Sequence, residues 1–208
     1  MTELSDFGIN LTGGGARGAY QAGALMGIQE ILKSQGLTGK KNPFQYWSGV
    51  SAGSINACYC AAGIEDLEGT IFRLTKLWAD IQPQKVYCTD FTTVSKNGAK
   101  WVRDLTFGPI LKKKIARSLL DTKPLWSLIR DNIDFSAIEV ALQNGYAKGI
   151  ACSAYSYNDN RIVTFLQSKE SVQWNKARRY SKQLQLTAEH VVASCAIPIL
   201  FPSIPING

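Results

Sequence analysis

Residues 44–62 read FQYWSGVSAGSINACYCAA, and this stretch decides the fold. Its first part, Phe44–Val50, is aromatic and apolar and predicts a β-strand. The second part, Ala52–Ala62, predicts a helix of small side chains that can pack closely against a sheet, and Gly63 ends it. Ser51 stands between the two parts. The stretch therefore predicts a tight strand-to-helix turn around one serine.

This turn carries the motif Gly49-Val50-Ser51-Ala52-Gly53, a G-x-S-x-G. A serine in such a turn projects its Oγ out of a strained backbone, which small neighbours such as Gly49 and Gly53 tolerate. The N-terminus of the following helix also favours negative charge there. A G-x-S-x-G motif also occurs often by chance, and the alternative interpretation is a turn whose serine caps the helix. Because a strand and a helix are predicted on either side, we interpret Ser51 as a nucleophile.

A second glycine-rich turn, Gly13-Gly14-Gly15-Ala16-Arg17-Gly18, follows a predicted first strand at Phe7–Leu11. Its spacing fits the dinucleotide fingerprint, which needs an acidic residue about 20 positions further on. Residues 36–42, GLTGKKN, contain no acid. Consecutive glycines also leave backbone N–H groups uncovered, and these can bind the oxyanion of a tetrahedral intermediate. Because this turn lies upstream of the serine turn, we favour an oxyanion hole over a dinucleotide-binding site.

Predicted strands and helices alternate from the start of the chain. Further helices are expected at 19 to about 33, 66–80, 136–143 and 187–194, with short helices over 100–131 broken at Gly108-Pro109 and Lys123-Pro124. Strands are expected at 149–157 and 162–167, joined by a hairpin, with a strand approach at 198–206 and irregular structure at 82–99. The alternation favours an α/β sandwich around a largely parallel sheet.

Length and composition fit one folded domain, and we expect residues 1–208 to form a single catalytic domain. Hydrophobic residues make up 45% and charged residues 19%, which is typical of a packed core. The cysteines lack zinc-ligand spacing, so we expect reduced, mostly buried thiols and no metal. The N-terminus is acidic, and no apolar run approaches the roughly 18 residues that span a membrane. We predict a cytoplasmic protein without signal peptide or transmembrane segment.

Positive charge is concentrated in residues 96–130, although the whole chain carries only +7. The basic residues of this segment are Lys96, Lys100, Arg103, Lys112, Lys113, Lys114, Arg117, Lys123 and Arg130. Only Asp104 and Asp121 oppose them, so the segment accounts for the net charge. Large apolar residues such as Trp101 and Phe107 lie between them. We predict a basic, helical, cap-like segment that contacts anionic membranes; the alternative is an ordinary solvated basic face.

The chain has one histidine, His190. A hydrolase with a catalytic triad would need it as the base. Its place within the predicted helix at 187–194 indicates instead a partly buried helix residue. This shortage of histidine favours a mechanism in which an aspartate activates the serine directly.

Three stretches together resemble the patatin-like phospholipases: GGGARGAYQAGAL, GVSAGSINA and ASCAIPILFP. They match in order and spacing from Phe7 to about Pro202. The resemblance implies an α/β, patatin-like three-layer sandwich around a mainly parallel sheet. It also implies a lipid acyl hydrolase of the phospholipase A type, which cleaves carboxyl esters of membrane glycerolipids through a serine acyl-enzyme and needs no cofactor.

By position, the resemblance makes Ser51 the nucleophile and Arg17 a residue that fixes the oxyanion loop by hydrogen bonds. The loop itself would comprise Gly13, Gly14, Gly15, Arg17 and Gly18. The family uses a Ser–Asp dyad with its aspartate in Asp-Gly-Gly or Asp-Gly-Ala, and no aspartate of this sequence precedes a glycine. We therefore expect the aspartate beyond Gly208, and we expect the 208 residues alone to be inactive or nearly so.

Two other functions stay open. An acyltransferase would use the same serine turn but pass the acyl group to an acceptor other than water. A catalytically incomplete protein would only bind lipid. In every case the expected partners are a phospholipid or other acyl lipid and an anionic membrane surface contacted peripherally. We expect no nucleic acid partner, and the sequence indicates no particular oligomeric state.

Overall fold

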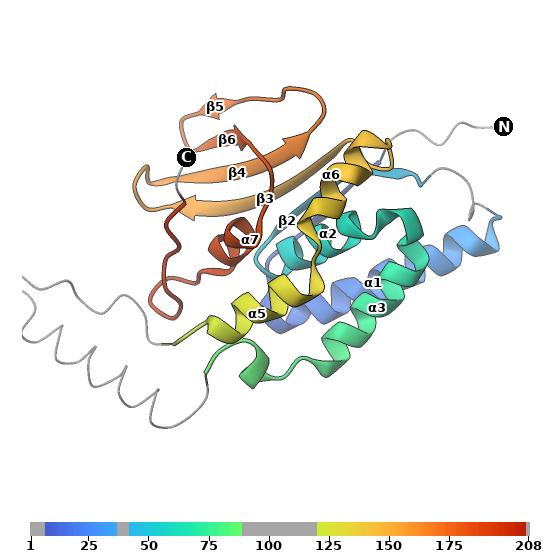
Figure 1. The fold of residues 1–208 in the computed structure, drawn as a ribbon, viewed down its shortest axis with the longest axis horizontal. Coiled ribbons are helices and arrows are strands. Elements are labelled where there is room, and N and C mark those ends of the chain that lie inside the picture. Colours follow the sequence, from blue (N-terminus) through green and yellow to red (C-terminus); the bar gives the residue numbers. More distant parts are fainter. Residues whose placement is uncertain (1–6, 37–41, 89–119, 207–208) are drawn as a thin grey trace, which may run out of the picture.

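A computed structural model describes residues 7–36, 42–88 and 120–206 (Figure 1). The strands are β1 (Phe7–Leu11), β2 (Phe44–Val50), β3 (Gly149–Ser156), β4 (Arg161–Ser168), β5 (Asn175–Lys176) and β6 (Arg179–Gln183). The helices are α1 (Gly18–Ser34), α2 (Ala52–Ala62), α3 (Leu67–Asp80), α5 (Lys123–Asn132), α6 (Phe135–Gln143) and α7 (Ala188–Cys195), with short 3-10 helices at Gly15–Arg17, Ile64–Asp66 and Pro83–Lys85. The strands form one sheet in the order β1-β2-β3-β4-β6-β5.

The sheet is mixed but mainly parallel, as predicted. The pairs β1–β2, β2–β3 and β4–β6 are parallel, whereas the β3–β4 hairpin and the β5–β6 pair are antiparallel. Since β1, β2 and β3 run in the same direction, their carboxyl ends meet at one edge of the sheet. In α/β folds this edge is where ligands bind. The glycine-rich turn after β1 and the serine turn after β2 therefore lie together.

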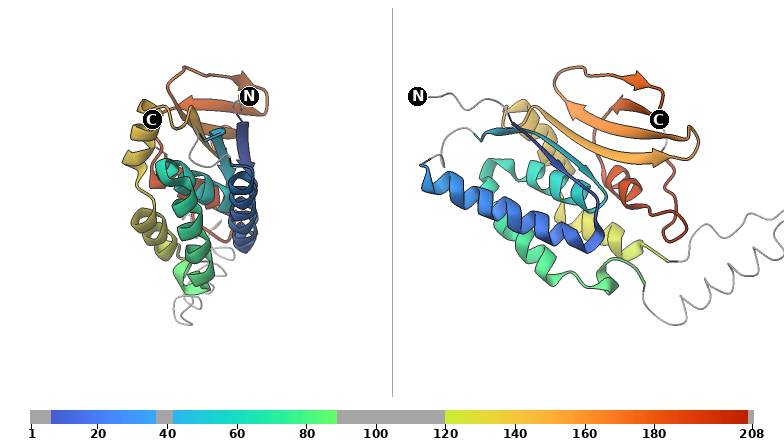
Figure 2. Two further views of the ribbon diagram at one scale, coloured as in Figure 1. Left: turned by 90° about the vertical axis from the view of Figure 1, so that its right-hand side faces the viewer. Right: turned by 180° about the vertical axis from the view of Figure 1, so that it is seen from behind.

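Helices α2 and α7 connect the sheet to the remaining helices. Both contact the strands on the same face, and α1, α3 and α6 pack in turn against α2 (Figures 1 and 2). Tyr46, Val50 and Tyr155 project from the opposite face and are exposed. The α/β class is confirmed. Among the described residues helices cover only this one face of the sheet, so the third layer of the sandwich stays a prediction.

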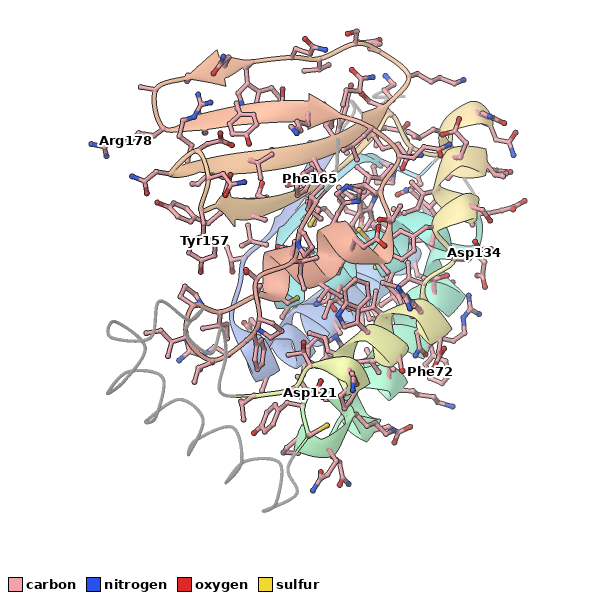
Figure 3. All side chains as sticks on the ribbon, turned by 60° about the vertical axis from the view of Figure 1, so that its left-hand side comes forward. Phe72, Asp121, Asp134, Tyr157, Phe165 and Arg178 are labelled. Carbon is pink, nitrogen blue, oxygen red and sulfur yellow. The ribbon has the colours of Figure 1, made fainter. Side chains whose placement is uncertain are left out.

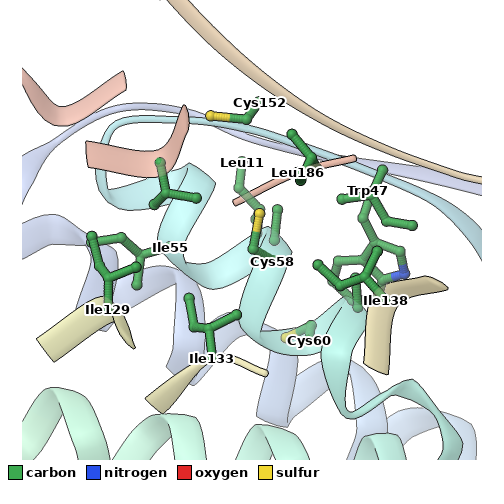
Figure 4. Close-up of a cluster of buried hydrophobic side chains, with 14 of the residues drawn as sticks. Leu11, Trp47, Ile55, Cys58, Cys60, Ile129, Ile133, Ile138, Cys152 and Leu186 are labelled. Carbon is green, nitrogen blue, oxygen red and sulfur yellow. The ribbon is translucent and has the colours of Figure 1, made fainter. Parts of the chain in front are cut away.

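The core lies between the sheet and α2. Figure 4 shows Leu11, Trp47 and Cys152 of the strands on the side of α2 that carries Cys58. Isoleucines of α5 and α6 approach α2 from the other side. All residues of α2 except Tyr59 and Ala62 are buried. The helix can lie this deep because most of its side chains are small. This agrees with the close packing that the sequence predicts.

Three segments differ from the sequence prediction. Residues 198–206 form turns and extended chain rather than a strand, with Ile199 at a φ of 71°. The short strands β5 and β6 were not predicted. Lys123-Pro124 begins α5 rather than breaking a helix, because proline is well placed in a first helical turn. Of the basic segment 96–130, residues 96–119 lie outside the described part of the chain.

Cys58, Cys60, Cys152 and Cys195 are buried free thiols, as predicted, and Cys88 is half-buried. Within the described residues, no helix is both long enough and apolar enough to cross a membrane.

Candidate active site

Ser51 occupies the turn between β2 and α2 in a strained backbone conformation. Its φ is 54° and its ψ is −125°. A positive φ at a residue other than glycine costs on the order of 1–3 kcal/mol and persists only where the surroundings enforce it. The strained serine turn that the sequence predicts is therefore present, and its neighbours explain how it is held.

Two glycines make the turn sterically feasible. A Cβ on Gly49 would overlap the carbonyl oxygen of Gly53, because the turn brings these residues into contact. A Cβ on Gly53 would overlap the carbonyl oxygen of Leu11, the last residue of β1. Only glycine fits at either position. Gly53 thus lets α2 approach the end of β1, where the glycine-rich turn begins.

Hydrogen bonds hold both sides of the Ser51 peptide. The Ser54 backbone N–H and hydroxyl donate to the Ser51 carbonyl at 2.8 and 2.6 Å. The Ser51 N–H donates to Ser194 Oγ of α7 at 2.8 Å, and that hydroxyl donates to the Ser153 carbonyl of β3 at 2.6 Å. Ser194 thus links the Ser51 turn to α7 and β3. Sequence reasoning missed this role of Ser194, although the residue lies within the ASCAIPILFP stretch.

The glycine-rich turn lies directly beside Ser51. A Cβ on Gly13 would sit 3.4 Å from the Cβ of Ser51, which is ordinary van der Waals contact. Within the described residues, the N–H groups of Gly13 and Gly14 make no backbone hydrogen bond. Gly15 has a φ of 54°, which favours glycine. Uncovered amide donors therefore lie next to the serine, as an oxyanion hole requires.

Gly18 and Arg17, the other two residues of the predicted oxyanion loop, do not contribute uncovered amides beside Ser51. Gly18 is the buried first residue of α1, and a Cβ there would overlap the ring of Trp78. Packing is thus sufficient to explain why glycine stands at this position. Arg17 is exposed and its N–H donates to the Gly14 carbonyl at 3.1 Å. Its guanidinium makes no hydrogen bond to any described residue, and its stem packs against Gly14 instead.

Two thiols, those of Cys195 and Cys152, lie close to the Ser51 turn. Burial raises the pKa of Cys195 to about 12, and its contact with the Ser51 side chain offsets this only in part. Burial raises the pKa of Cys152 to about 11. Both thiols are therefore neutral at pH 7 and cannot serve as a base. In the described part of the chain, the Ser51 hydroxyl makes no hydrogen bond to a carboxylate or an imidazole.

His190 is part of the start of α7. Its Nδ1 accepts a hydrogen bond from the Thr187 N–H at 3.0 Å, and its ring packs against Phe165 with 4.5 Å between centroids. Figure 3 shows Phe165 directed from the sheet toward α7. Burial lowers the pKa of His190. These contacts agree with the interpretation of His190 as a structural residue.

A cavity of about 860 Å³ opens beside Ser51. It extends along the β3–β4 hairpin and the chain that follows α7. Its lining is mixed: Ile162, Phe165, Ile197 and Ile204 are apolar, whereas residues such as Ser156, Asn158 and Lys182 are polar or charged. Asp159 also lines it, but it lies in the hairpin turn, where its carboxylate accepts hydrogen bonds from the hydroxyls of Ser156 and Tyr180. Those hydroxyl bonds hold the pKa of Asp159 below its usual value.

The site thus combines a half-buried, strained serine, a glycine-rich turn and a deep small-residue helix, and a family comparison covers all three. The model of the patatin-like phospholipases matches residues 10–208. The chain belongs to this family.

Other comparisons add little to this assignment. Comparison with curated proteins gives no match. Among solved structures, the chain is similar to human GIVD cytosolic phospholipase A2 in complex with methyl gamma-linolenyl fluorophosphonate, with a TM-score of 0.44 and 20% identity. The likeness covers 78% of this chain and 23% of the human one. At this TM-score it supports no inference about this patatin-like chain.

Proposed function

We propose that Ser51 is the nucleophile of a phospholipase A type lipid acyl hydrolase that cleaves carboxyl esters of membrane glycerolipids. The observation that carries the proposal is the contact between Gly13 and Ser51, which sets uncovered amide donors beside a serine in a strained turn. Membership in the patatin-like phospholipase family supports the lipid substrate.

The chemistry follows from this arrangement. Ser51 Oγ attacks the ester carbonyl carbon, and the amides of Gly13 and Gly14 stabilise the oxyanion of the tetrahedral intermediate. The ester C–O bond then breaks, and the lysolipid alcohol leaves with a proton. Water hydrolyses the acyl-enzyme to a free fatty acid and regenerates the serine. One oxyanion donor contributes on the order of 3 kcal/mol to lowering such a barrier.

Activation of the serine requires a base within about 2.6–3.2 Å of Oγ. We propose the aspartate of a Ser–Asp dyad, as the family resemblance implies. The neutral thiols of Cys152 and Cys195 cannot take this role, and His190 Nδ1 is already bonded to the Thr187 N–H. The described residues provide no base beside Ser51, so we propose that this aspartate lies outside them.

The cavity supports an acyl lipid as the substrate. Its volume of about 860 Å³ and the apolar part of its wall suit a fatty acyl chain, whose burial contributes about 0.8 kcal/mol per methylene. A chain that enters along the β3–β4 hairpin would bring its ester to Ser51. A membrane-bound substrate also agrees with peripheral contact at an anionic surface.

A fluorophosphonate probe tests the proposal, because it reacts with activated serines. In the complete gene product we expect one adduct on Ser51 and hydrolysis of phospholipid vesicles, both abolished by Ser51→Ala. Ser203→Ala is a matched control, since Ser203 also lines the cavity. An adduct that persists in Ser51→Ala would contradict the assignment. Full, Ser51-dependent turnover by residues 1–208 would show that the base lies within them.

A further inference from the structure

Asn56 is a buried amide on α2, the helix that begins at Ser51, and it is 0% exposed. Its Nδ2 donates to the Gly18 carbonyl at 3.0 Å and to Gln21 Oε1 at 3.0 Å. Its Oδ1 accepts from Trp78 Nε1 at 2.6 Å. Both amide protons and the oxygen are thus bonded. The indole N–H can only donate, so it also fixes which way the amide points.

Gln21 extends this set of bonds to the other end of the glycine-rich turn. Its Oε1 accepts from Asn56, and its Nε2 donates to the Thr12 carbonyl at 2.7 Å. Thr12 immediately precedes Gly13, and Gly18 immediately follows Arg17. The two side chains therefore hold the turn by a backbone carbonyl on each side, and they are bonded to each other.

Trp78 of α3 gives the set a rigid support. Its ring lies so close to Gly18 that no Cβ fits there, and its N–H anchors Asn56. Gly18 is thereby fixed by a ring contact and a hydrogen bond. The turn itself makes few bonds of its own, since the N–H groups of Gly13 and Gly14 are not used within the described residues. Its position depends on what holds its ends.

We propose that Asn56 and Gln21 are positioning residues that set the oxyanion loop relative to Ser51. Asn56 is well suited to this because its own helix starts at the nucleophile, so one rigid element carries the serine and the anchor of the loop. Oxyanion donors act only if they lie about 2.7–3.1 Å from the developing charge. A displacement of about 1 Å costs on the order of 10²-fold in rate. The proposal rests on the function proposed above.

The test uses the complete gene product with Asn56→Ala and Gln21→Met, assayed on phospholipid vesicles. Gln21→Met keeps the side-chain length and removes only the amide, and Gln21 is partly exposed, so this variant should fold. We expect each to lower kcat by about 10–100-fold with little change in KM, because oxyanion bonds form only in the transition state. The double variant should lose less than the product of the two effects, since both act through one turn.

Thr70→Val is the matched control. Thr70 is 1% exposed and donates to the Gly63 carbonyl at 2.8 Å, so the variant also removes a buried bond between a side chain and a backbone carbonyl. It should lose stability in urea without a drop in kcat. A folded Asn56→Ala and Gln21→Met with normal kcat, or an equal loss in Thr70→Val, would overturn this proposal alone. If the wild-type protein lacks Ser51-dependent turnover, the proposed function fails, and this proposal fails with it.

Discussion

Ser51 keeps its strained backbone because groups from distant parts of the chain hold it. Ser54 binds its carbonyl from within α2, whereas Ser194 binds its N–H from 143 residues away. The hydroxyl of Ser194 is itself oriented by the Ser153 carbonyl. Ser51, the proposed nucleophile, is thus fixed by its own helix, by α7 and by β3 at once.

Replacing Ser194 by alanine should disturb this turn. The variant leaves the Ser51 N–H and the Ser153 carbonyl without their partner, and an unpaired buried polar group costs about 1–3 kcal/mol. We expect a loss of stability of this size in urea and a lower kcat on phospholipid vesicles. Ser194→Thr keeps the hydroxyl and should recover part of both. Unchanged stability and kcat in Ser194→Ala would show that the bond does not hold the Ser51 turn.

His190 should affect stability rather than chemistry, and its effect should depend on pH. Its folded pKa is lowered by burial from the ordinary value of 6.5, and protonation of Nδ1 would break the bond from Thr187. Stability is therefore fully present above pH 6.5, and it falls at lower pH because the unfolded chain binds the proton more readily.

His190→Gln removes this titration, so its free energy of unfolding should change less between pH 7 and pH 5 than that of the wild-type protein. Its kcat should stay close to the wild-type value. A loss of about 10³-fold or more in a folded variant would instead support a catalytic triad.

The sequence predicts some residues of the site and misses others for a physical reason. Local patterns reveal Ser51 and Gly13, because a strained turn demands glycine nearby in the sequence. The bond from Asn56 to Gly18 spans 38 residues and that from Ser51 to Ser194 spans 143. No local pattern encodes such pairs, so the residues that hold the site were visible only once the fold was known.

Helices and strands with a local sequence pattern were likewise predicted, whereas those set by tertiary contacts were missed. The bounds of β2 and α2 agree with the prediction, because an apolar run, a glycine turn and a small-residue helix each leave a local pattern. Strand β6, Arg179–Gln183, reads RYSKQ and shows no apolar alternation. It becomes a strand because it pairs with β4, which is a tertiary effect. Residues 198–206 had strand-like composition but no described partner strand.

A pair of glycine substitutions tests how closely α2 fits the end of β1. Gly53→Ala would overlap the Leu11 carbonyl and should destabilise the protein by about 3 kcal/mol, near the upper end for an overpacked core. Gly27→Ala in α1 meets no atom within 4 Å and should stabilise it by about 0.5–1 kcal/mol, since alanine loses less entropy in a helix. Urea unfolding measures both. A Gly53→Ala protein as stable as wild type would contradict the close contact.

At the scale of the whole molecule, charge is distributed unevenly. The net charge of +7 equals that of residues 96–130, so the rest of the chain is balanced. Of the basic side chains in this segment, Lys123 and Arg130 are described. Lys123 is largely exposed beside Asp121, and Arg130 stacks on Trp126 at 4.7 Å. The remaining basic residues lie outside the described part of the chain, so membrane contact stays a prediction from sequence.

Residues 96–130 should bind anionic vesicles more tightly than neutral ones. Each basic group near an anionic surface contributes about 1 kcal/mol, and salt screens this attraction. Neutralising Lys112, Lys113 and Lys114 to glutamine should therefore weaken binding to phosphatidylserine vesicles by on the order of 10–100-fold in sedimentation assays at low salt. The matched control neutralises Lys76, Lys85 and Lys176, which are exposed elsewhere, and should bind like wild type. Equal, salt-insensitive binding to neutral and anionic vesicles would mean that the segment is an ordinary solvated basic face.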